Sequence, residues 1–369
     1  MGKRLIYTHL DVDGITSARI AQHTSRYREA EVKFTPSIFF GVQGLPPNIE
    51  EYEEVICLDI GCAQDTVNFL ADVASRGVRV ILLDHHQPDN PKLISDLQGP
   101  NLRIIVDQTH CTASLAYKIF SNLGFFNDPK WPEVWCIVGI YGDVAKDKPG
   151  AREVLDQLAP KYPELISQLD CDTNRIWMHQ PAGMIARAMN MVRRLAYDAG
   201  AKICLNALAE AEKAGDPFIL IRDLDYEEWP NYPNIVLMRE LIEDYRRMEE
   251  DIQHRLIDLD KIGVGIISSK ADIGGTIARR GVKKLKKPVF VINDGIVKGF
   301  MKLSGRSDTI NLVEVLRIAE RLSGGKIRGG GHPKAVAGTF PKISFWEVCM
   351  YLSRAVREYE KTYSRQENS

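Results

Sequence analysis

Apolar and polar positions alternate along the first 150 residues in a pattern that predicts a layered α/β fold. Short apolar runs, typical of strands buried in a parallel sheet, occupy residues 4–8, 54–59, 78–84 and 102–106. Between or after them, apolar positions recur at helical spacing in residues 16–28, 63–76, 112–123 and 132–141. Strands that alternate with helices favour a doubly wound, mostly parallel sheet, and such sheets bind ligands beyond the carboxyl ends of their strands.

The remainder of the chain predicts a helical connector followed by a smaller α/β domain. Further short strands are expected at residues 263–268, 289–293 and 299–304, with a helix at 310–323 and a glycine-rich loop at 329–333. The amphipathic pattern at 241–259 indicates a helix that packs on its own domain, joins two domains or pairs two subunits in a homodimer. We therefore expect three parts, at residues 1–185, 186–258 and 259–362.

The composition is that of an ordinary folded protein. The chain has 369 residues, of which 44% are hydrophobic and 26% are charged, which suits two domains with sizeable cores. It lacks an apolar run of about 18 residues, and its first residues lack the apolar segment of a signal peptide. The seven cysteines form no CxxC pair and are interpreted as reduced thiols. These features predict a cytoplasmic protein without a membrane span.

The charge is distributed unevenly, although the formal net charge is only −1. Residues 279–338 hold 14 Lys or Arg and 4 Asp or Glu, a net charge of +10, so the rest of the chain carries −11. The densest basic segment includes Arg279 and Lys283 and continues to residue 287. The alternatives are a solvated helix end and a surface that binds a phosphate backbone.

Carboxylates and histidines follow several of the predicted strands. The set comprises Asp11, Asp13, Asp59, Asp84, His85, His86 and Asp143. Carboxylates that converge at one edge of a sheet repel one another, and divalent cations remove that penalty. Oxygen ligands combined with imidazole suit Mn²⁺ or Mg²⁺ better than Zn²⁺. The joint pattern, more than any one residue, indicates a metal-dependent active site.

These motifs resemble those of the DHH phosphoesterase superfamily. Asp84-His85-His86 is the tripeptide that names the superfamily, and the resemblance extends to THLDVDGITSA at 8–18, CLDIG at 57–61 and YGDVAKD at 141–147. The segment GGGHPKA at 329–335 resembles the signature of the DHHA1 domain, which accompanies DHH in RecJ-like exonucleases, nano-RNases and cyclic-dinucleotide phosphodiesterases.

The resemblance implies a role for each of these positions. Two Mn²⁺ ions, with Mg²⁺ as the alternative, would be held by Asp11, Asp13, Asp59, His85 and Asp143, and Asp59 would bridge them. Asp84 would orient His85, and His86 would contact the phosphate or the leaving group. In the second domain, the implied substrate-binding residues are Arg306, Gly329, Gly330, Gly331 and His332, to which the basic segment adds Arg279 and Lys283.

One position departs from the commoner family pattern. Several members place a ligand histidine four residues before the first aspartate of the motif, where this chain has Tyr7. On an extended strand Tyr7, His9 and Asp11 share one face, so His9 is added to the expected metal ligands.

Three functional interpretations follow from the resemblance. The favoured one is an Mn²⁺-dependent exonuclease that acts on single-stranded DNA or RNA in repair or replication, like RecJ or the archaeal Hef-associated nuclease, with a repair or replication protein as a partner. The second is a nano-RNase or cyclic-dinucleotide phosphodiesterase. The third is a non-enzymatic replication scaffold, which the intact motif carboxylates disfavour. The long connector and the basic segment favour a longer polyanion over a dinucleotide.

Overall fold

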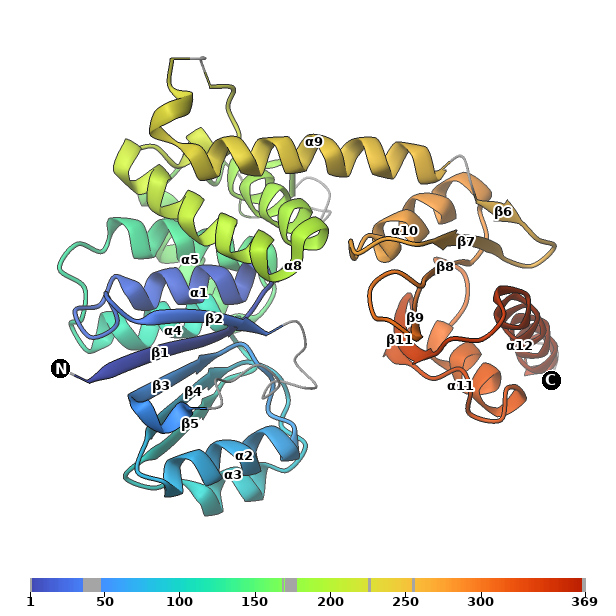
Figure 1. The fold of residues 1–369 in the computed structure, drawn as a ribbon, viewed down its shortest axis with the longest axis horizontal. Helices are drawn as coiled ribbons and strands as arrows, with labels where there is room; N and C mark the ends of the chain where they lie inside the picture. The colour runs from blue at the N-terminus through green and yellow to red at the C-terminus, as the bar shows by residue number, and fades with distance from the viewer. Residues whose placement is uncertain are drawn as a thin grey trace. The chain divides into compact units, whose positions relative to one another are not determined.

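The structure is a computed structural model that describes residues 2–35, 48–167, 169, 178–224, 227–253 and 256–366. The chain forms two compact units, Met1–Ile242 and Glu243–Ser369 (Figure 1). The predicted division into three parts at residues 185 and 258 stays a prediction.

The first unit is built on a five-stranded parallel sheet. Its strands are β1 (Lys3–His9), β2 (Glu31–Thr35), β3 (Tyr52–Leu58), β4 (Arg79–Asp84) and β5 (Leu102–Val106). They lie in the order β2-β1-β3-β4-β5, and every neighbouring pair is parallel. The strand order reverses between β1 and β3, which makes this point the expected ligand crevice of the sheet. The prediction of a doubly wound parallel sheet is confirmed.

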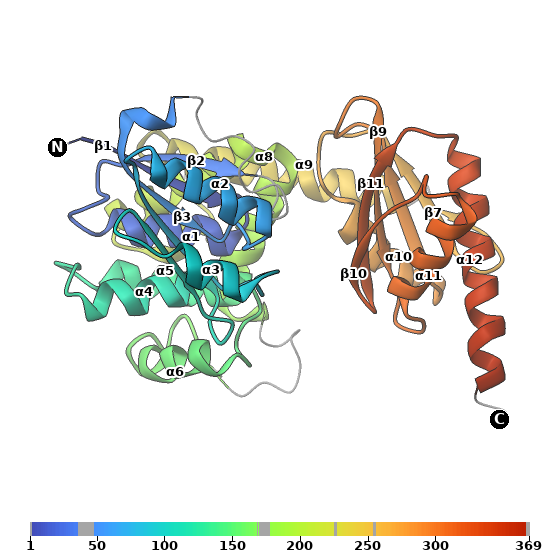
Figure 2. The same ribbon diagram turned by 90° about the horizontal axis from the view of Figure 1, so that it is seen from below.

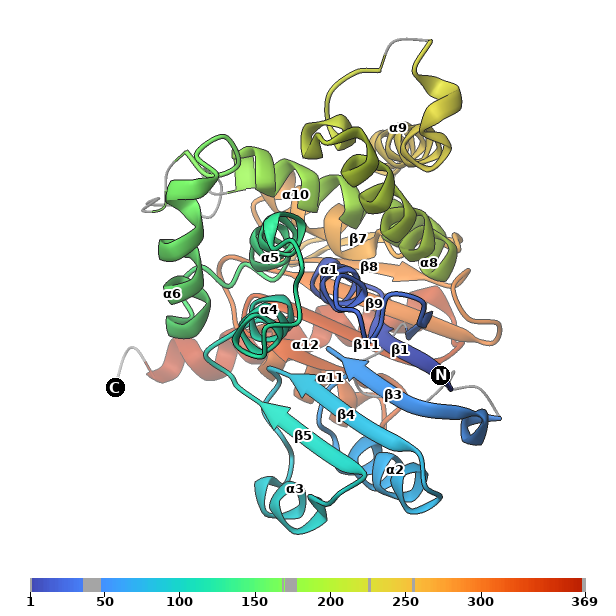
Figure 3. The same cartoon turned by 90° about the vertical axis from the view of Figure 1, so that its left-hand side faces the viewer.

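Helices cover both faces of this sheet. Figure 3 shows α1, α4 and α5 on one face and α2 and α3 on the other. The α-helices that begin in this unit are α1 (Val12–Gln22), α2 (Gln64–Ser75), α3 (Pro91–Leu97), α4 (Thr112–Asn122), α5 (Lys130–Gly142), α6 (Pro149–Leu158), α8 (Pro181–Ala214) and α9 (Pro233–Gln253). Short 3₁₀ turns lie at Ile49–Glu51, Ala159–Lys161, Pro217–Leu220 and Trp229–Asn231. Separate hydrophobic clusters fill the two faces.

Helix α1 and strand β2 differ from the sequence prediction, and the short helix α3 was not predicted. Helix α1 begins at Val12 and not at residue 16, because the Asp11 carboxylate accepts the Gly14 N–H at 2.9 Å and caps the helix there. A Cβ on Gly14 would lie 2.2 Å from the His9 carbonyl oxygen, so only glycine allows this tight passage from β1 into α1. Strand β2 was not predicted, since it is an edge strand with a largely polar sequence.

A buried carboxylate joins α8 to α1 and α5. Glu212 accepts hydrogen bonds from Arg19 Nε at 2.8 Å and from the Trp135 indole at 2.6 Å. His23 Nε2 lies 2.9 Å from the same carboxylate, and Arg19 adds a second hydrogen bond. Burial alone would raise the pKa of Glu212, but His23 and Arg19 outweigh burial and lower it to about 2. The network therefore stabilises the ionised carboxylate inside the unit.

The second unit is built on a mixed six-stranded sheet. Its strands are β6 (Ile257–Asp258), β7 (Gly263–Ile267), β8 (Val289–Asn293), β9 (Phe300–Arg306), β10 (Gly330–His332) and β11 (Ala335–Pro341), in the order β10-β11-β9-β8-β7-β6. Only β7 and β8 are parallel to each other. Helix α10 (Gly274–Leu285) lies on one face, and α11 (Leu312–Leu322) and α12 (Phe345–Gln366) lie on the other (Figure 1). This confirms the predicted smaller α/β domain.

The glycine-rich segment is not the loop that the sequence predicted. Gly330, Gly331 and His332 form β10, which pairs antiparallel with β11 and lies at the edge of the sheet (Figure 2). A Cβ on Gly329 would lie 2.4 Å from the Ala337 carbonyl oxygen, and one on Gly331 would lie 2.4 Å from that of Ala335. These two glycines are therefore required by the close approach of the paired strand.

Two other expectations from composition concern the helices and the cysteines. None of the helices in the described ranges has both the length and the apolar character that crossing a bilayer requires. Six cysteines in the described part of the chain are buried free thiols, which agrees with the prediction of reduced cysteines. Cys171 lies outside the described residues.

Candidate metal centre

The predicted metal-site residues meet at one edge of the parallel sheet. They lie where β1, β3 and β4 end and at the C-terminus of α5: His9, Asp11, Asp13, Asp59, Asp84, His85, His86 and Asp143. β1, β3 and β4 are consecutive neighbours in the sheet, and the switch in strand order falls between the first two (Figure 3). The topology thus brings together residues that are up to 134 positions apart in the sequence.

His9, Asp11 and Asp59 form a first group whose ligand atoms lie within 4.8 Å of one another. His9 Nδ1 is 3.1 Å from Asp11 Oδ2 and 3.5 Å from Asp59 Oδ2. That nitrogen is buried and has no partner in hydrogen-bonding geometry within the described structure. A buried nitrogen that faces two carboxylates without such a bond is suited to a cation between them.

Asp13, His85 and Asp143 form a second group of the same kind. His85 Nδ1 is 3.4 Å from Asp13 Oδ2, and His85 Nε2 is 3.8 Å from Asp143 Oδ2. Asp59 also groups with His85 and His86, whose Nδ1 atoms lie 3.7 and 3.8 Å from Asp59 Oδ1. Asp59 therefore stands between the two groups of ligands.

The backbone at Asp59 is strained. Its φ angle is 60°, in the left-handed region that residues other than glycine rarely adopt. The Asp59 N–H donates to the Leu83 carbonyl at 3.1 Å, which ties the residue to the end of β4. Residues held in this conformation cluster at functional sites, because the surrounding structure must fix them at a cost in stability. The residue that adopts this conformation is also shared by two of the ligand groups in the described structure.

The carboxylates repel one another electrostatically. Burial and the charges of Asp11, Asp13 and Asp84 raise the pKa of Asp59 well above its ordinary value. Burial and Asp13 also raise the pKa of Asp143, although His85 and Lys148 partly offset this. A divalent cation would stabilise the ionised forms of both residues, so the donor set and its electrostatics fit such an ion.

Asp84 has a different role from the one implied by the resemblance. Its carboxylate accepts the N–H groups of Gly61 at 2.7 Å, His85 at 2.7 Å and His86 at 2.8 Å. It also bonds the His86 ring at Nδ1, at 2.7 Å, whereas the expected bond to the His85 ring is not formed. Burial would raise the pKa of Asp84, but the bonds to His86 outweigh it and lower that pKa. Asp84 thus fixes the turn after β4 and the His86 imidazole.

Thr112 is part of the centre and was missed by the sequence analysis. Its hydroxyl donates to Asp59 Oδ1 at 3.1 Å and lies 3.2 Å from His85 Nδ1. The N–H groups of Thr112 and Ala113, at the start of α4, each donate to Asp13 at 2.8 Å. The N-terminus of α4 therefore holds Asp13, and the Thr112 hydroxyl joins Asp59 to His85. A threonine at the first position of a predicted helix was the available signal.

Tyr7 and His9 are the residues at which the first motif of this chain departs from the commoner family pattern. The Tyr7 side chain is buried and bonds to Thr35, and burial raises its pKa to about 12. Only His9 of these two contributes to the groups of candidate ligands in the described structure.

Two of the predicted substrate residues of the second unit, His332 and Arg306, are aligned across the sheet, because both are paired with Ala335 of β11. Arg306 ends β9 and lies over Gly275, where a Cβ would come within 2.8 Å of its guanidinium. His332 lies on exposed β10, two strands away from β9 in the sheet. Arg279 pairs with Asp308, which partly neutralises its charge, and Lys283 is exposed on α10.

Comparisons with known proteins agree with this fold and site. The sequence model of the DHH family, N-terminal domain, matches residues 3–136, and that of the DHHA1 domain matches residues 264–361. The chain is 24% identical over 359 residues to the single-stranded-DNA-specific exonuclease RecJ of Bacillus subtilis (strain 168), covering 91% of this chain and 43% of that protein.

Solved structures show the same fold. RecJ from Thermus thermophilus in complex with Mn²⁺ superposes with a TM-score of 0.66 at 20% identity, covering 96% of this chain and 52% of that one. A second exonuclease RecJ structure, bound to manganese, gives a TM-score of 0.64 at 20% identity and covers 97% of this chain and 90% of that one. The chain spans about half the length of the Bacillus and Thermus relatives.

The chain therefore contains an N-terminal domain of the DHH family followed by a DHHA1 domain. Its fold and sequence are similar to those of RecJ.

Proposed function

We propose that this protein is a divalent-metal-dependent phosphodiesterase that hydrolyses single-stranded nucleic acid from an end. The observation that carries the proposal is the set of three-residue ligand groups at the switch point of the sheet, two of which share Asp59. The similarity to RecJ, which is named as a single-stranded-DNA-specific exonuclease, supports the choice of substrate. Mn²⁺ is the proposed ion, with Mg²⁺ as the alternative, since structures of the same fold are described in complex with each of them.

Each side chain has a place in this chemistry. His9 and Asp11 would hold one ion, Asp13, His85 and Asp143 would hold a second, and Asp59 would contact both. When bound, paired divalent cations activate water for in-line attack on phosphorus and offset the negative charge that develops.

His86 is proposed to contact the substrate. Its Nδ1 bonds to Asp84, which fixes the ring and leaves Nε2 as the nitrogen that can face a phosphate or a leaving group. The side chain is 29% exposed, whereas the neighbouring His85 side chain is 9% exposed. His85 stacks on His86 with ring centroids 4.3 Å apart, which further restricts the ring orientation.

A degradation time course tests the proposal. Single-stranded DNA and RNA of about 25 nucleotides, labelled at the 5′ end, are incubated with the protein and Mn²⁺ beside a labelled dinucleotide. Cleavage of the long strands is expected, and the products give the polarity: shortening from the 3′ end produces a ladder of labelled intermediates, whereas attack at the 5′ end releases the label at once. Cleavage of the dinucleotide alone would favour the nano-RNase alternative. Cleavage of none of these substrates would contradict the proposal and favour the scaffold alternative.

Thr112→Val should weaken Mn²⁺ binding by about 10- to 100-fold, because the hydroxyl that joins Asp59 to His85 is lost while the side-chain shape is kept. Isothermal titration calorimetry with Mn²⁺ measures this effect without turnover. Thr112→Ser keeps the hydroxyl and should bind Mn²⁺ close to the wild-type affinity. Equal affinities of the Val and Ser variants would show that the hydroxyl does not position the ligands.

Arg306→Ala should weaken the binding of single-stranded nucleic acid and leave the Mn²⁺ content intact, since Arg306 lies in the second unit. The loss of one cation that contacts a phosphate should also make the salt dependence of binding shallower by about 0.7. Binding titrations at several salt concentrations, with metal analysis of the same samples, measure both quantities. A fall in metal content at unchanged nucleic-acid affinity would contradict the proposed division of roles.

A cytoplasmic location, a homodimer and a repair or replication partner stay predictions.

A further inference from the structure

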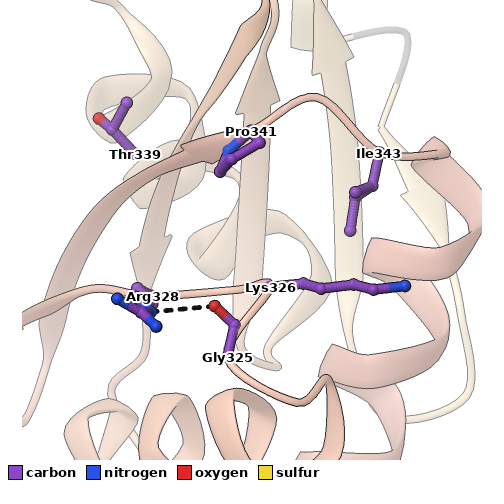
Figure 4. A pocket seen from close by; sticks show the side chains of 6 residues that line it. All are labelled: Gly325, Lys326, Arg328, Thr339, Pro341 and Ile343. Carbon is purple, nitrogen blue, oxygen red and sulfur yellow. Dashed lines mark hydrogen bonds between the residues drawn. The ribbon is translucent and has the colours of Figure 1, made fainter.

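A pocket of about 500 Å³ lies in the second unit, outside the residues predicted to bind substrate (Figure 4). It is enclosed by the segment that joins α11 to β10, by the end of β11 and by the residues that follow β11. Its lining residues are Gly325, Lys326, Arg328, Thr339, Pro341 and Ile343.

The two sides of the pocket differ in chemistry. Figure 4 shows Lys326 and Arg328 along one side and Pro341 and Ile343 on the other. The Lys326 and Arg328 side chains are 53% and 71% exposed. Each cation has an acidic partner in a long, exposed ion pair, at 3.8 Å from Lys326 to Glu347 and 3.6 Å from Arg328 to Glu320, and Arg328 Nε also donates to the Gly325 carbonyl at 3.0 Å. Such exposed pairs are weak, so both cations keep donors for an anion.

A nucleotide has groups that suit both the basic side and the apolar side of the pocket. Its phosphate suits the lysine and the arginine, because a guanidinium and an ammonium are the common protein partners of phosphate oxygens. The flat face of its base suits Pro341 and Ile343, since apolar side chains pack against the π-face of a base. A free anion such as phosphate would use only one side of the pocket.

The edge strand leads from this pocket to His332. Arg328 is directly followed by the three glycines, and all three residues of β10 are exposed. β10 is an edge strand of the sheet, and a Cβ on Gly330 would meet nothing within 4 Å, so the strand is open to a ligand at this residue. The four steps from Arg328 to His332 span roughly 13 Å of extended chain. A single strand that follows this edge would meet His332 at one end and the pocket at the other.

We propose that the pocket binds one nucleotide unit of a single-stranded nucleic acid, at a distance along the strand from the unit held beside His332. The phosphate contacts Lys326 and Arg328, and the base packs on Pro341 and Ile343. This inference rests on the proposed function and extends its substrate from an end group to a strand of several nucleotides.

The test measures binding and not turnover. The full chain is titrated in EDTA with fluorescein-labelled single-stranded DNA and RNA of the same sequence, at lengths of about 3 and 25 nucleotides and several salt concentrations. The Lys326→Ala/Arg328→Ala double variant is compared with Lys342→Ala. Lys342 lies in the same part of the chain but bonds to Asp294 at 2.6 Å and does not line the pocket.

The double variant should bind the 25-mers several-fold more weakly than the wild type. The slope of log K against log salt should be shallower by about 1.4, for two lost phosphate contacts on a single strand. The loss should be larger for the 25-mers than for the 3-mers, and Lys342→Ala should bind the 25-mers almost as the wild type does. A loss on DNA alone or on RNA alone identifies which strand the pocket prefers.

Other outcomes overturn the inference. The inference fails if the double variant binds the 25-mers as tightly as the wild type, or if Lys342→Ala loses as much affinity as the double variant. It also fails if the double variant loses as much affinity for the 3-mers as for the 25-mers, or if the wild type binds neither 25-mer. The proposed function is judged separately by the degradation time course. A wild type that binds the 25-mers through the pocket but cleaves nothing would contradict the proposed function and support the pocket.

Discussion

Asp59→Asn will reduce hydrolysis by about a thousandfold or more and leave the fold intact. Asp59 is the one side chain that groups with His9 and Asp11 on one side and with His85 and His86 on the other. Asparagine keeps the shape but loses the charge that would hold both ions, so the ligand set loses its shared member. Initial rates with Mn²⁺ and a labelled single strand measure the loss, and calorimetry with Mn²⁺ should show weaker binding.

The fold should survive this substitution because the change removes a source of repulsion. The neighbouring carboxylates and burial already disfavour the charge on Asp59, so an uncharged amide costs the apoprotein little. Asp65→Asn, at an exposed position on α2 in the same unit, is the matched control and should keep wild-type rates. Retained hydrolysis in Asp59→Asn would refute the two-ion assignment, and an unfolded variant by circular dichroism would refute the stability argument.

Glu212→Gln will destabilise the protein at neutral pH by about 3 kcal/mol. The change replaces an ionised, 11% exposed carboxylate with an amide and leaves the Arg19 charge poorly compensated. Urea unfolding in EDTA, followed by tryptophan fluorescence, measures the difference between variant and wild type. Glu153→Gln is the control, because Glu153 forms an exposed ion pair with Lys118 and should change stability by less than about 1 kcal/mol.

The effect of Glu212→Gln should depend on pH in a defined direction. The pKa of Glu212 is about 2 in the folded protein, below its ordinary value of 4.5. A carboxyl group whose pKa is lowered by folding stabilises the fold above its unfolded pKa, and that contribution is lost as the pH falls through the folded value. The gap between wild type and variant should therefore narrow as the pH falls from about 4.5 toward about 2. A gap that stays constant over this range would show that Glu212 is not stabilised as an anion.

The sequence predicted the strands and helices whose burial produces a clear pattern of apolar residues. Strands β3 and β4 are almost continuously apolar because helices cover both faces of the sheet, and both were predicted within two residues of their ends. Strand β2 was not predicted, since an edge strand needs fewer apolar residues. Strands β10 and β11 were missed because glycine, small residues and proline leave little hydrophobic pattern, although backbone pairing forms both.

The residues of the candidate site could be predicted from their types and from their positions after the predicted strands. The hydrogen bonds among them could not be predicted in this way. The order of motifs was enough to gather Asp11, Asp59 and His85, because parallel strands bring their carboxyl ends to one edge. Which histidine Asp84 bonds depends on how the His85 and His86 rings are oriented after β4. The contribution of Thr112 depends on the direction of α4. Neither is encoded in spacing along the chain.

The strand order has a consequence for biosynthesis. The two candidate ligand groups draw on residues from His9 to Asp143, so neither can be completed by a short N-terminal fragment: the first needs Asp59 and the second needs Asp143. At ordinary translation rates of about 5–20 residues per second, the ribosome needs roughly 7–27 s to synthesise the chain from His9 to Asp143. During that interval a nascent chain has several carboxylates but no complete centre. Both ligand groups can therefore be loaded with metal only after synthesis has passed Asp143.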